Sequence, residues 1–435
     1  MITNMKITRT WYALLAVALL AQTGNVSGDP GDSDAYKKHL AAARAAQMRR
    51  DLIRAEAELA ECLKIRKDDP EVHFLAARTA RRGGDLQKAE THLKECKRFK
   101  GDVSAISLEQ LLLRAQSGEL AVLENLAKLT GDKHPETSLI LEALAQGYKG
   151  SFRYSEAMAS LNALLKHDPK NAHAFLEQAW IWLRWSGEKD GKKTTWTTIN
   201  AGDSDKAAAT FRKALEIDPE LFEARLGLAD LQLLEKNITE AKKNLDKLVE
   251  RHSKNPKVQL LLAQCDMFMG ETENAEKRLV DLLTRDPRNA AAWHLRGKLA
   301  GNPTQSEKWF RRALELNPNA PEFNYSLFVC LMQTGKRAEA GQFKKNYERI
   351  VKDLTHLAQV LGKIDSKPRD VALRSEAGKI FLQLGQDREG LAMLYGVLEH
   401  DPSHRTTHQV LADYFDRIRQ TEKAALHRKK AEEEK

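Results

Sequence analysis

The stretch that decides the fold is PKVQLLLAQCDMFMGETENAEKRLVDLLTRDP, residues 256–287. It holds two small residues twelve positions apart, Ala263 and Ala275, and a bulky apolar residue, Leu279, four positions after the second. This spacing is typical of two antiparallel helices of about 12 to 14 residues joined by a tight turn, with the small residues where the helices cross. Leu279 shares a face with Ala275 and is expected to pack against the next unit.

The same spacing recurs along the chain, so the unit is a repeat. Further pairs of small residues twelve apart are Ala77 and Ala89, Ala145 and Ala157, Ala229 and Ala241, Gly378 and Gly390, and Ala412 and Ala424. The chain has 435 residues, of which 42% are hydrophobic and 30% charged, with only 12 prolines. That composition is typical of a long helical protein, and a repeat array escapes the size limit of a single core.

Proline and glycine mark the ends of the expected helices. Asp-Pro or Asn-Pro is expected to end each second helix, because the residue before proline is pushed out of the α region and proline lacks an N–H donor. These steps lie at residues 69–70, 168–169, 218–219, 255–256, 286–287, 317–318 and 401–402. The turns inside the units are expected at Gly83-Gly84-Asp85, Gly270, Gly335 and Gly385.

On these residues the chain resembles the tetratricopeptide-repeat family, whose unit of about 34 residues follows the pattern W-x2-L-G-x2-Y, then A-x3-F, then P. The best matching sets are Ala145, Tyr148, Ala157, Leu161 and Pro169; Ala207, Phe211, Ala214 and Pro219; and Trp293, Gly297, Phe310, Ala313 and Pro318. The resemblance runs from about residue 35 to the end. It implies an all-α fold, a right-handed α-solenoid of about ten to eleven stacked antiparallel helix pairs.

Departures from the period predict where the array is interrupted. Pro169 and Pro219 are separated by more than one period, which predicts an inserted loop at 187–202. A shortened loop is expected at Gly301-Asn302-Pro303, since Pro287 and Pro318 are closer than one period. We therefore expect a repeat array at 35–352, an extra helix or spacer at 353–367, and C-terminal repeat units with a charged cap at 368–435.

The N-terminus is predicted to be an export signal. Lys6 and Arg9 precede an apolar run from Trp11 to Ala21, and a polar stretch follows, which is the order of a cleavable secretory signal. A permanent membrane anchor is the weaker alternative, because the run is shorter than the roughly 20 residues of a bilayer span. We expect residues 1–28 to be cleaved, residues 29–34 to be a short linker, and the mature chain to be periplasmic or extracellular.

Export raises the question of disulfides for the four cysteines, Cys62, Cys96, Cys265 and Cys330. Cys62 and Cys96 are one period apart, on second helices of successive units, at an expected separation of about 8 to 10 Å between helix axes. A disulfide needs Cα atoms within about 7 Å. The cysteines are therefore predicted to be free thiols that serve as small core residues.

No motif supports a catalytic, cofactor or metal site. Residues 187–194 contain Gly191-Lys192-Lys193-Thr194, but they follow a helix rather than a strand and lack the spacing of a phosphate-binding loop. His404 and His408 are four apart, yet no further ligand with zinc-site spacing accompanies them, so they are interpreted as solvated residues at a helix start. We expect no enzyme, no cofactor and no metal.

The concave face of a repeat array is the expected binding surface, since its first helices line an extended groove. Trp180 and Arg184 are four apart and are predicted to face this groove, or to pack against the inserted loop. Trp182 falls at a packing position and is interpreted as core. A second candidate is the basic stripe formed by Arg78, Arg81 and Arg82, which could receive an acidic segment and could equally be a solvated face.

The sequence thus favours a protein-interaction scaffold that holds a peptide or protein partner by rigid display. The formal net charge of +9 leaves open an alternative, a helical-repeat protein that binds nucleic acid or another polyanion. Interspersed acidic residues and the expected export argue against it. A further alternative is a non-catalytic subunit of an envelope enzyme or export complex.

Overall fold

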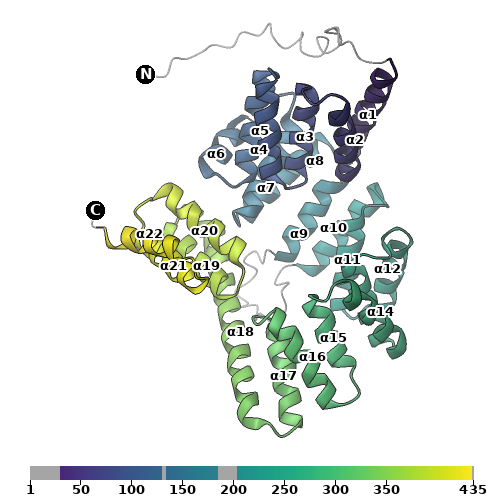
Figure 1. The fold of residues 1–435 in the computed structure, drawn as a ribbon, viewed down its shortest axis with the longest axis vertical. Coiled ribbons are helices and arrows are strands. Elements are labelled where there is room, and N and C mark those ends of the chain that lie inside the picture. The colour runs from purple at the N-terminus through teal and green to yellow at the C-terminus, as the bar shows by residue number, and fades with distance from the viewer. Residues whose placement is uncertain (1–29, 130–133, 185–202, 434–435) are drawn as a thin grey trace. The chain divides into compact units, whose positions relative to one another are not determined.

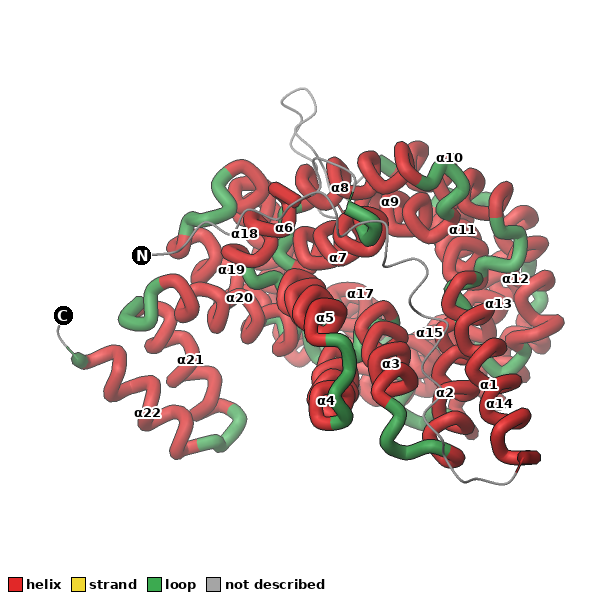
Figure 2. The backbone as a smooth tube through the Cα atoms, turned by 90° about the horizontal axis from the view of Figure 1, so that it is seen from above, coloured by secondary structure: helices red, strands yellow, loops and turns green. Residues whose placement is uncertain are grey.

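The computed structural model describes residues 30–129, 134–184 and 203–433. These residues form 22 α-helices and no strand, and short loops join the helices (Figures 1 and 2). The helices are α1 (Pro30–Met48), α2 (Leu52–Ile65), α3 (Pro70–Arg82), α4 (Leu86–Arg98), α5 (Val103–Gln116), α6 (Leu120–Leu129), α7 (Thr137–Gly150), α8 (Tyr154–His167), α9 (Ala172–Arg184), α10 (Ser204–Ile217), α11 (Phe222–Leu234), α12 (Ile238–His252), α13 (Pro256–Phe268), α14 (Thr272–Arg285), α15 (Ala290–Leu299), α16 (Pro303–Leu316), α17 (Pro321–Gln333), α18 (Arg337–Ser366), α19 (Val371–Gln383), α20 (Asp387–His400), α21 (Arg405–Arg417) and α22 (Thr421–Glu432).

Successive helices pack in the pairs α1–α2 and α3–α4, and again from α7–α8 to α21–α22; within each of these two runs every pair packs on the next, as in a helical solenoid. The predicted all-α repeat fold is therefore confirmed. The chain divides into two compact units, Met1–Leu113 and Arg114–Lys435, and α5 crosses the boundary between them. Within the described ranges, no helix combines the length and the hydrophobicity that crossing a membrane requires.

The small residues of the repeat are buried between the paired helices, as the sequence predicted. Ala263 and Ala275 are both fully buried in the α13–α14 pair, and Leu279 is buried beside them. The turn glycines Gly84, Gly270, Gly335 and Gly385 all have positive φ, a conformation that glycine adopts without a steric penalty.

The proline steps serve two purposes. Five of the residues before proline are C-caps of second helices, as predicted: Asp168, Asp218, Asp286, Asn317 and Asp401. The prediction was wrong for Asp69 and Asn255, whose side chains instead cap the N-termini of α3 and α13. Pro70 and Pro256 then occupy the first turn of a helix, where the missing N–H has no helical partner to lose.

Four helices of the second unit depart from the common length of 13 to 15 residues, and two of them, α15 and α18, bear on the predicted interruptions. α15 has 10 residues, in agreement with the shortened spacing predicted near Gly301. α18 has 30 residues and runs without a break, so the separate helix expected at 353–367 is instead its second half. The buried residues Ile350, Leu357 and Ile364 are seven apart and keep one face of this long helix against the core.

The predicted signal and the predicted insertion at 187–202 lie outside the described residues. α1 begins at Pro30, inside the stretch expected to be a linker. All four cysteines are unpaired and buried, as the sequence predicted. Burial raises the pKa of the Cys62 and Cys265 thiols to about 11, so both stay protonated near neutral pH.

The second unit contains a contact between segments more than two hundred residues apart, which we call the seam. The turn between α7 and α8 places Phe152 against the core of α18–α20, with its ring centroid 5.2 Å from that of Phe381. Beside it, the Ser155 N–H and hydroxyl donate to the Asp365 carboxylate at 3.0 and 2.6 Å. The seam thus joins the start and the end of a long run of repeats.

Candidate binding site

Trp180 is partly buried and packs against the core of α9, α10 and α11. Its indole packs edge-on against Phe211 on α10 at 5.2 Å between centroids, and a Cβ atom added at Gly227 on α11 would lie 3.2 Å from it. Arg184 is the last residue of α9 and is exposed. Trp182 is partly buried against the same core, and the Lys206 ammonium lies 4.6 Å from its ring centroid. Partner binding by Trp180 and Arg184 therefore stays a prediction.

The basic stripe is not a row of exposed cations. Arg81 is fully buried, and its Nε donates to Glu109 Oε1 at 2.5 Å. Arg78 Nε donates to the other oxygen of Glu109 at 3.1 Å, and Arg82 Nη1 donates to the backbone carbonyl of Gln47 at 3.3 Å. Arg81 thus departs from the groove-facing position predicted for it, because the buried carboxylate of Glu109 on α5 draws it inward.

The histidines near the C-terminus are structural. His404 caps the N-terminus of α21, where its Nδ1 accepts from the Thr407 N–H at 3.3 Å. His408 is 1% exposed, so it is buried rather than solvated as the sequence suggested. Its Nε2 lies 2.9 Å from the Pro402 carbonyl and its Nδ1 2.9 Å from His427 Nδ1. The described residues contain no group of three side chains arranged to hold a metal ion.

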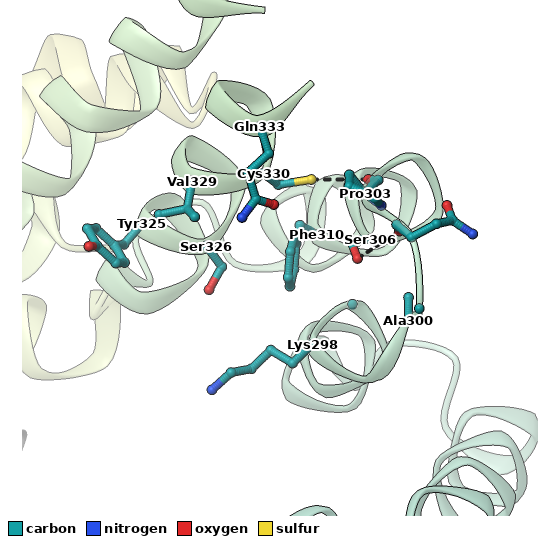
Figure 3. Close-up of a pocket in the computed structure, with 13 residues that line it drawn as sticks. Lys298, Ala300, Pro303, Ser306, Phe310, Tyr325, Ser326, Val329, Cys330 and Gln333 are labelled. Carbon is teal, nitrogen blue, oxygen red and sulfur yellow. Dashed lines mark hydrogen bonds between the residues drawn. The ribbon is translucent and has the colours of Figure 1, made fainter. Parts of the chain in front are cut away.

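A cavity of about 420 Å³ lies between α15 and α17, the first helices of two successive pairs (Figure 3). Phe310 of α16 forms part of its wall, and Lys298 and Ser326 lie on opposite sides of the opening (Figure 3). Tyr325 and Gln333 of α17 also line it. Tyr325 is 50% exposed, which leaves an aromatic side chain available at the rim.

The cavity exists because α15 stops early. α13 continues five residues past Ala263, whereas α15 continues only two past Gly297, the residue at the same position of its repeat. Three missing residues shorten a helix by about 4.5 Å. The extended segment Ala300–Asn302 replaces the last turn, and Asn302 caps α16 by accepting from the Gln305 N–H at 2.8 Å.

The wall of the cavity is tightly packed. A Cβ atom added at Gly297 would lie 2.4 Å from the Phe310 ring, so only glycine allows this ring to sit on α15. The Cys330 thiol lies 3.1 Å from the Pro303 carbonyl. Behind the opening, His294 Nε2 lies 2.9 Å from Ser326 Oγ. These contacts fix the shape of the cavity before any ligand enters.

The cavity is positive on balance. Lys298 is its only charged lining residue, is exposed, and has no ion pair among the described residues. Burial, with a smaller contribution from Lys298, lowers the pKa of His294 to about 3, so this imidazole is neutral at physiological pH. The site therefore presents one cation together with hydroxyl and amide groups.

The sequence alone does not reveal this site. The shortened spacing at Gly301-Asn302-Pro303 marks the right segment, but the spacing predicts a short loop and not the loss of a helical turn beside a groove. Lys298 and Tyr325 carry no motif of their own. Only the packing of α16 and α17 around the shortened helix turns them into one site.

Residues 199–252 and 232–299 match the family model for the tetratricopeptide repeat. No curated protein matches the chain. Among solved structures, a tetratricopeptide repeat protein from Parabacteroides merdae ATCC 43184 is 19% identical with a TM-score of 0.34, covering 68% of this chain and 99% of its own. Pseudomonas aeruginosa PilF is 14% identical with a TM-score of 0.33, covering 62% and 99%. The human IFIT1 dimer with PPP-AAAA is 16% identical with a TM-score of 0.40, covering 88% and 93%.

Proposed function

We infer that this chain, a tetratricopeptide-repeat protein, is a non-catalytic scaffold that binds a peptide segment of a partner protein beside α15 and α17. Repeats of this family hold protein partners on the faces of their helices. The observation that carries the proposal is the cavity of about 420 Å³ between these two first helices. Its volume falls in the range of about 300 to 1,000 Å³ that is usual for ligand sites.

The lining of the cavity suits a peptide. Tyr325 offers an exposed ring, a residue type enriched at interfaces, while Lys298, Ser326 and Gln333 supply hydrogen-bonding groups. Because Phe310 and Cys330 are held by the surrounding helices, the walls are preformed. Little ordering entropy is then lost on the scaffold's side when a partner binds.

The test is a crosslinking pull-down of the mature chain from its own envelope fraction. We compare the wild type with Lys298→Glu plus Tyr325→Ala, and with Trp180→Ala plus Arg184→Glu. Loss of one defined protein in the first double variant alone supports the α15–α17 site. Loss in the second alone moves the site to α9, and identical capture by all three chains contradicts both positions.

We further propose that the chain acts outside the cytoplasm. The support is the sequence alone: Lys6 and Arg9 followed by the apolar run from Trp11 to Ala21. Mass spectrometry of the chain recovered from fractionated cells provides the test. A mature N-terminus near residue 29 in an envelope or extracellular fraction supports export, whereas an intact N-terminus in the cytoplasmic fraction contradicts it.

A further inference from the structure

A second cavity, of about 580 Å³, lies on the other side of the α15 end. The first cavity is bounded by α15, α16 and α17, whereas the second is bounded by α14, α15 and α16. Ala300, the C-cap residue of α15, lines both. The two cavities therefore both border the residue at which α15 stops, one toward the first helix of the next pair and the other toward the second helix of the preceding pair.

One cause explains both cavities. The turn that α15 lacks would occupy the space beside Ala300, between α14 on one side and α17 on the other. Its replacement is a short extended segment that fills less volume than a helical turn. We call the two cavities together the α15 notch, and treat them as one gap in the wall of the repeat array.

We propose that the α15 notch holds an extended peptide segment that crosses the array from the α17 side to the α14 side, with an acidic residue at Lys298 and apolar residues beside Trp309. This inference rests on the proposed function, because it takes the occupant to be a peptide segment of a partner protein. It goes further by assigning the path of that segment and the charge it carries.

The α17 side selects an acidic residue. Lys298 is the only charged residue on this side, and no carboxylate among the described residues pairs with it. Ser326 and Gln333 add hydrogen-bonding groups nearby. A carboxylate that enters here gains a charge-assisted hydrogen bond and meets no like charge.

The α14 side selects neutral and apolar residues. Two acidic residues, Glu273 and Glu276, and two basic ones, Lys277 and Arg296, line this side, so their formal charges cancel. Arg296 Nε donates to Glu276 Oε1 at 3.0 Å, and the Arg296 guanidinium stacks over Trp309, 4.5 Å from the ring centroid. Leu299 and Trp309 supply the apolar part of this wall. A segment that buries apolar side chains here gains from the hydrophobic effect without breaking an ion pair.

The experiment uses the full mature chain and a displayed library of short linear peptides as the probe. Peptides selected on the wild type are then measured against Ala300→Trp, which fills the junction of the two cavities. The matched control is Ala338→Trp, at an exposed alanine on α18 that lines neither cavity. A photoreactive benzoylphenylalanine placed at Val329, and separately at Gln305, reports contact on the α17 side and on the α14 side.

The expected result is that one selected peptide crosslinks from both positions through different residues. Ala300→Trp should weaken its binding by tenfold or more, about 1.4 kcal/mol, while Ala338→Trp leaves it unchanged. Lys298→Glu should weaken binding, and replacing the peptide's acidic residue by lysine should restore it.

Two results overturn the proposal in different ways. Peptides that crosslink only from Val329 and bind Ala300→Trp normally contradict the crossing path but leave a peptide site on the α17 side. A library that yields no peptide crosslinking from either position contradicts the crossing path and the proposed site together.

Discussion

At the scale of single residues, one position on the first helix of a pair makes the same two contacts in several repeats, although its residue type differs. A side chain on a first helix contacts the carbonyl six residues earlier and a side chain nineteen residues later, on the second helix. His73 does so with Lys67 and His92, and His408 with Pro402 and His427. In two other repeats this position is occupied by Arg225, which pairs with Asn244, and by Gln259, which pairs with Arg278. The backbone of the repeat sets the geometry, and each unit supplies its own polar pair.

His294 predicts an acid limit to stability. Its pKa of about 3 in the folded chain lies below the ordinary value of 6.5, so the unfolded chain binds more protons between these values. Burial of the neutral imidazole therefore costs no stability above about pH 6.5, and the free energy of unfolding decreases as the pH falls below that value. We expect about 2 kcal/mol to be lost between pH 6.5 and pH 5, measured by urea unfolding.

The control separates this residue from general acid effects. His294→Gln should flatten the decline in the free energy of unfolding between pH 6.5 and pH 5. His400→Gln, at an exposed position, should decline as steeply as the wild type. Equal slopes for all three chains would show that His294 does not set the acid limit.

Gly297 is expected to tolerate no side chain. Gly297→Ala should lower the free energy of unfolding by about 1 to 3 kcal/mol, because the new methyl group would overlap the Phe310 ring. The matched control is Gly301→Ala, where no atom lies within 4 Å of the added Cβ. Chemical denaturation of both variants provides the measurement, and equal stability of the two would contradict this packing.

At the scale of elements, the sequence predicted the repeat better than its exceptions. Ala263, Ala275 and the turn glycines have fixed spacings, so the pairs could be placed from the chain alone. The unbroken α18 could not, because a weak periodic pattern does not reveal whether a helix stops or continues. The α15 notch was also out of reach, since a missing turn becomes a cavity only if neighbouring helices keep their places.

Glu109 is expected to anchor α5 to α3. Its carboxylate is 1% exposed and accepts from both Arg78 and Arg81. Glu109→Ala leaves the buried Arg81 without this counter-charge and should lower the free energy of unfolding by about 3 to 5 kcal/mol. Glu61→Ala removes an exposed pair with Lys64 and should leave the free energy of unfolding almost unchanged. Thermal unfolding followed by circular dichroism distinguishes the two, and matching losses would contradict the structural role of Glu109.

At the scale of the whole molecule, the seam is the main departure from a linear array. Besides Phe152, it includes a hydrogen bond from Arg374 Nη2 to the Ser151 carbonyl at 3.5 Å, and an ion pair between Arg369 and Glu124 at 2.6 Å. Phe152 has a φ of 60°, in the left-handed region, where five other turns have glycine and four have arginine or lysine. A bulky residue at such a position indicates that its packing outweighs the backbone strain.

Phe152→Gly tests this balance. Glycine relieves the strained φ but removes the ring from the α18–α20 core, and we expect a net loss of about 1 to 3 kcal/mol in the free energy of unfolding. Lys236 has the same φ of 60° and an exposed side chain, so Lys236→Gly should be neutral or stabilising by up to about 1 kcal/mol. A gain in both variants would show that the ring contributes nothing to the seam.

The seam also changes how the molecule carries force. In an open array, tension applied at the two ends passes through every repeat in turn. Here the start of α8 is hydrogen-bonded to α18 and the α7–α8 turn to α19, so the load has a short path across the seam. The repeats from α9 to α17, which include the α15 notch, are then shielded from tension on the ends until the seam breaks.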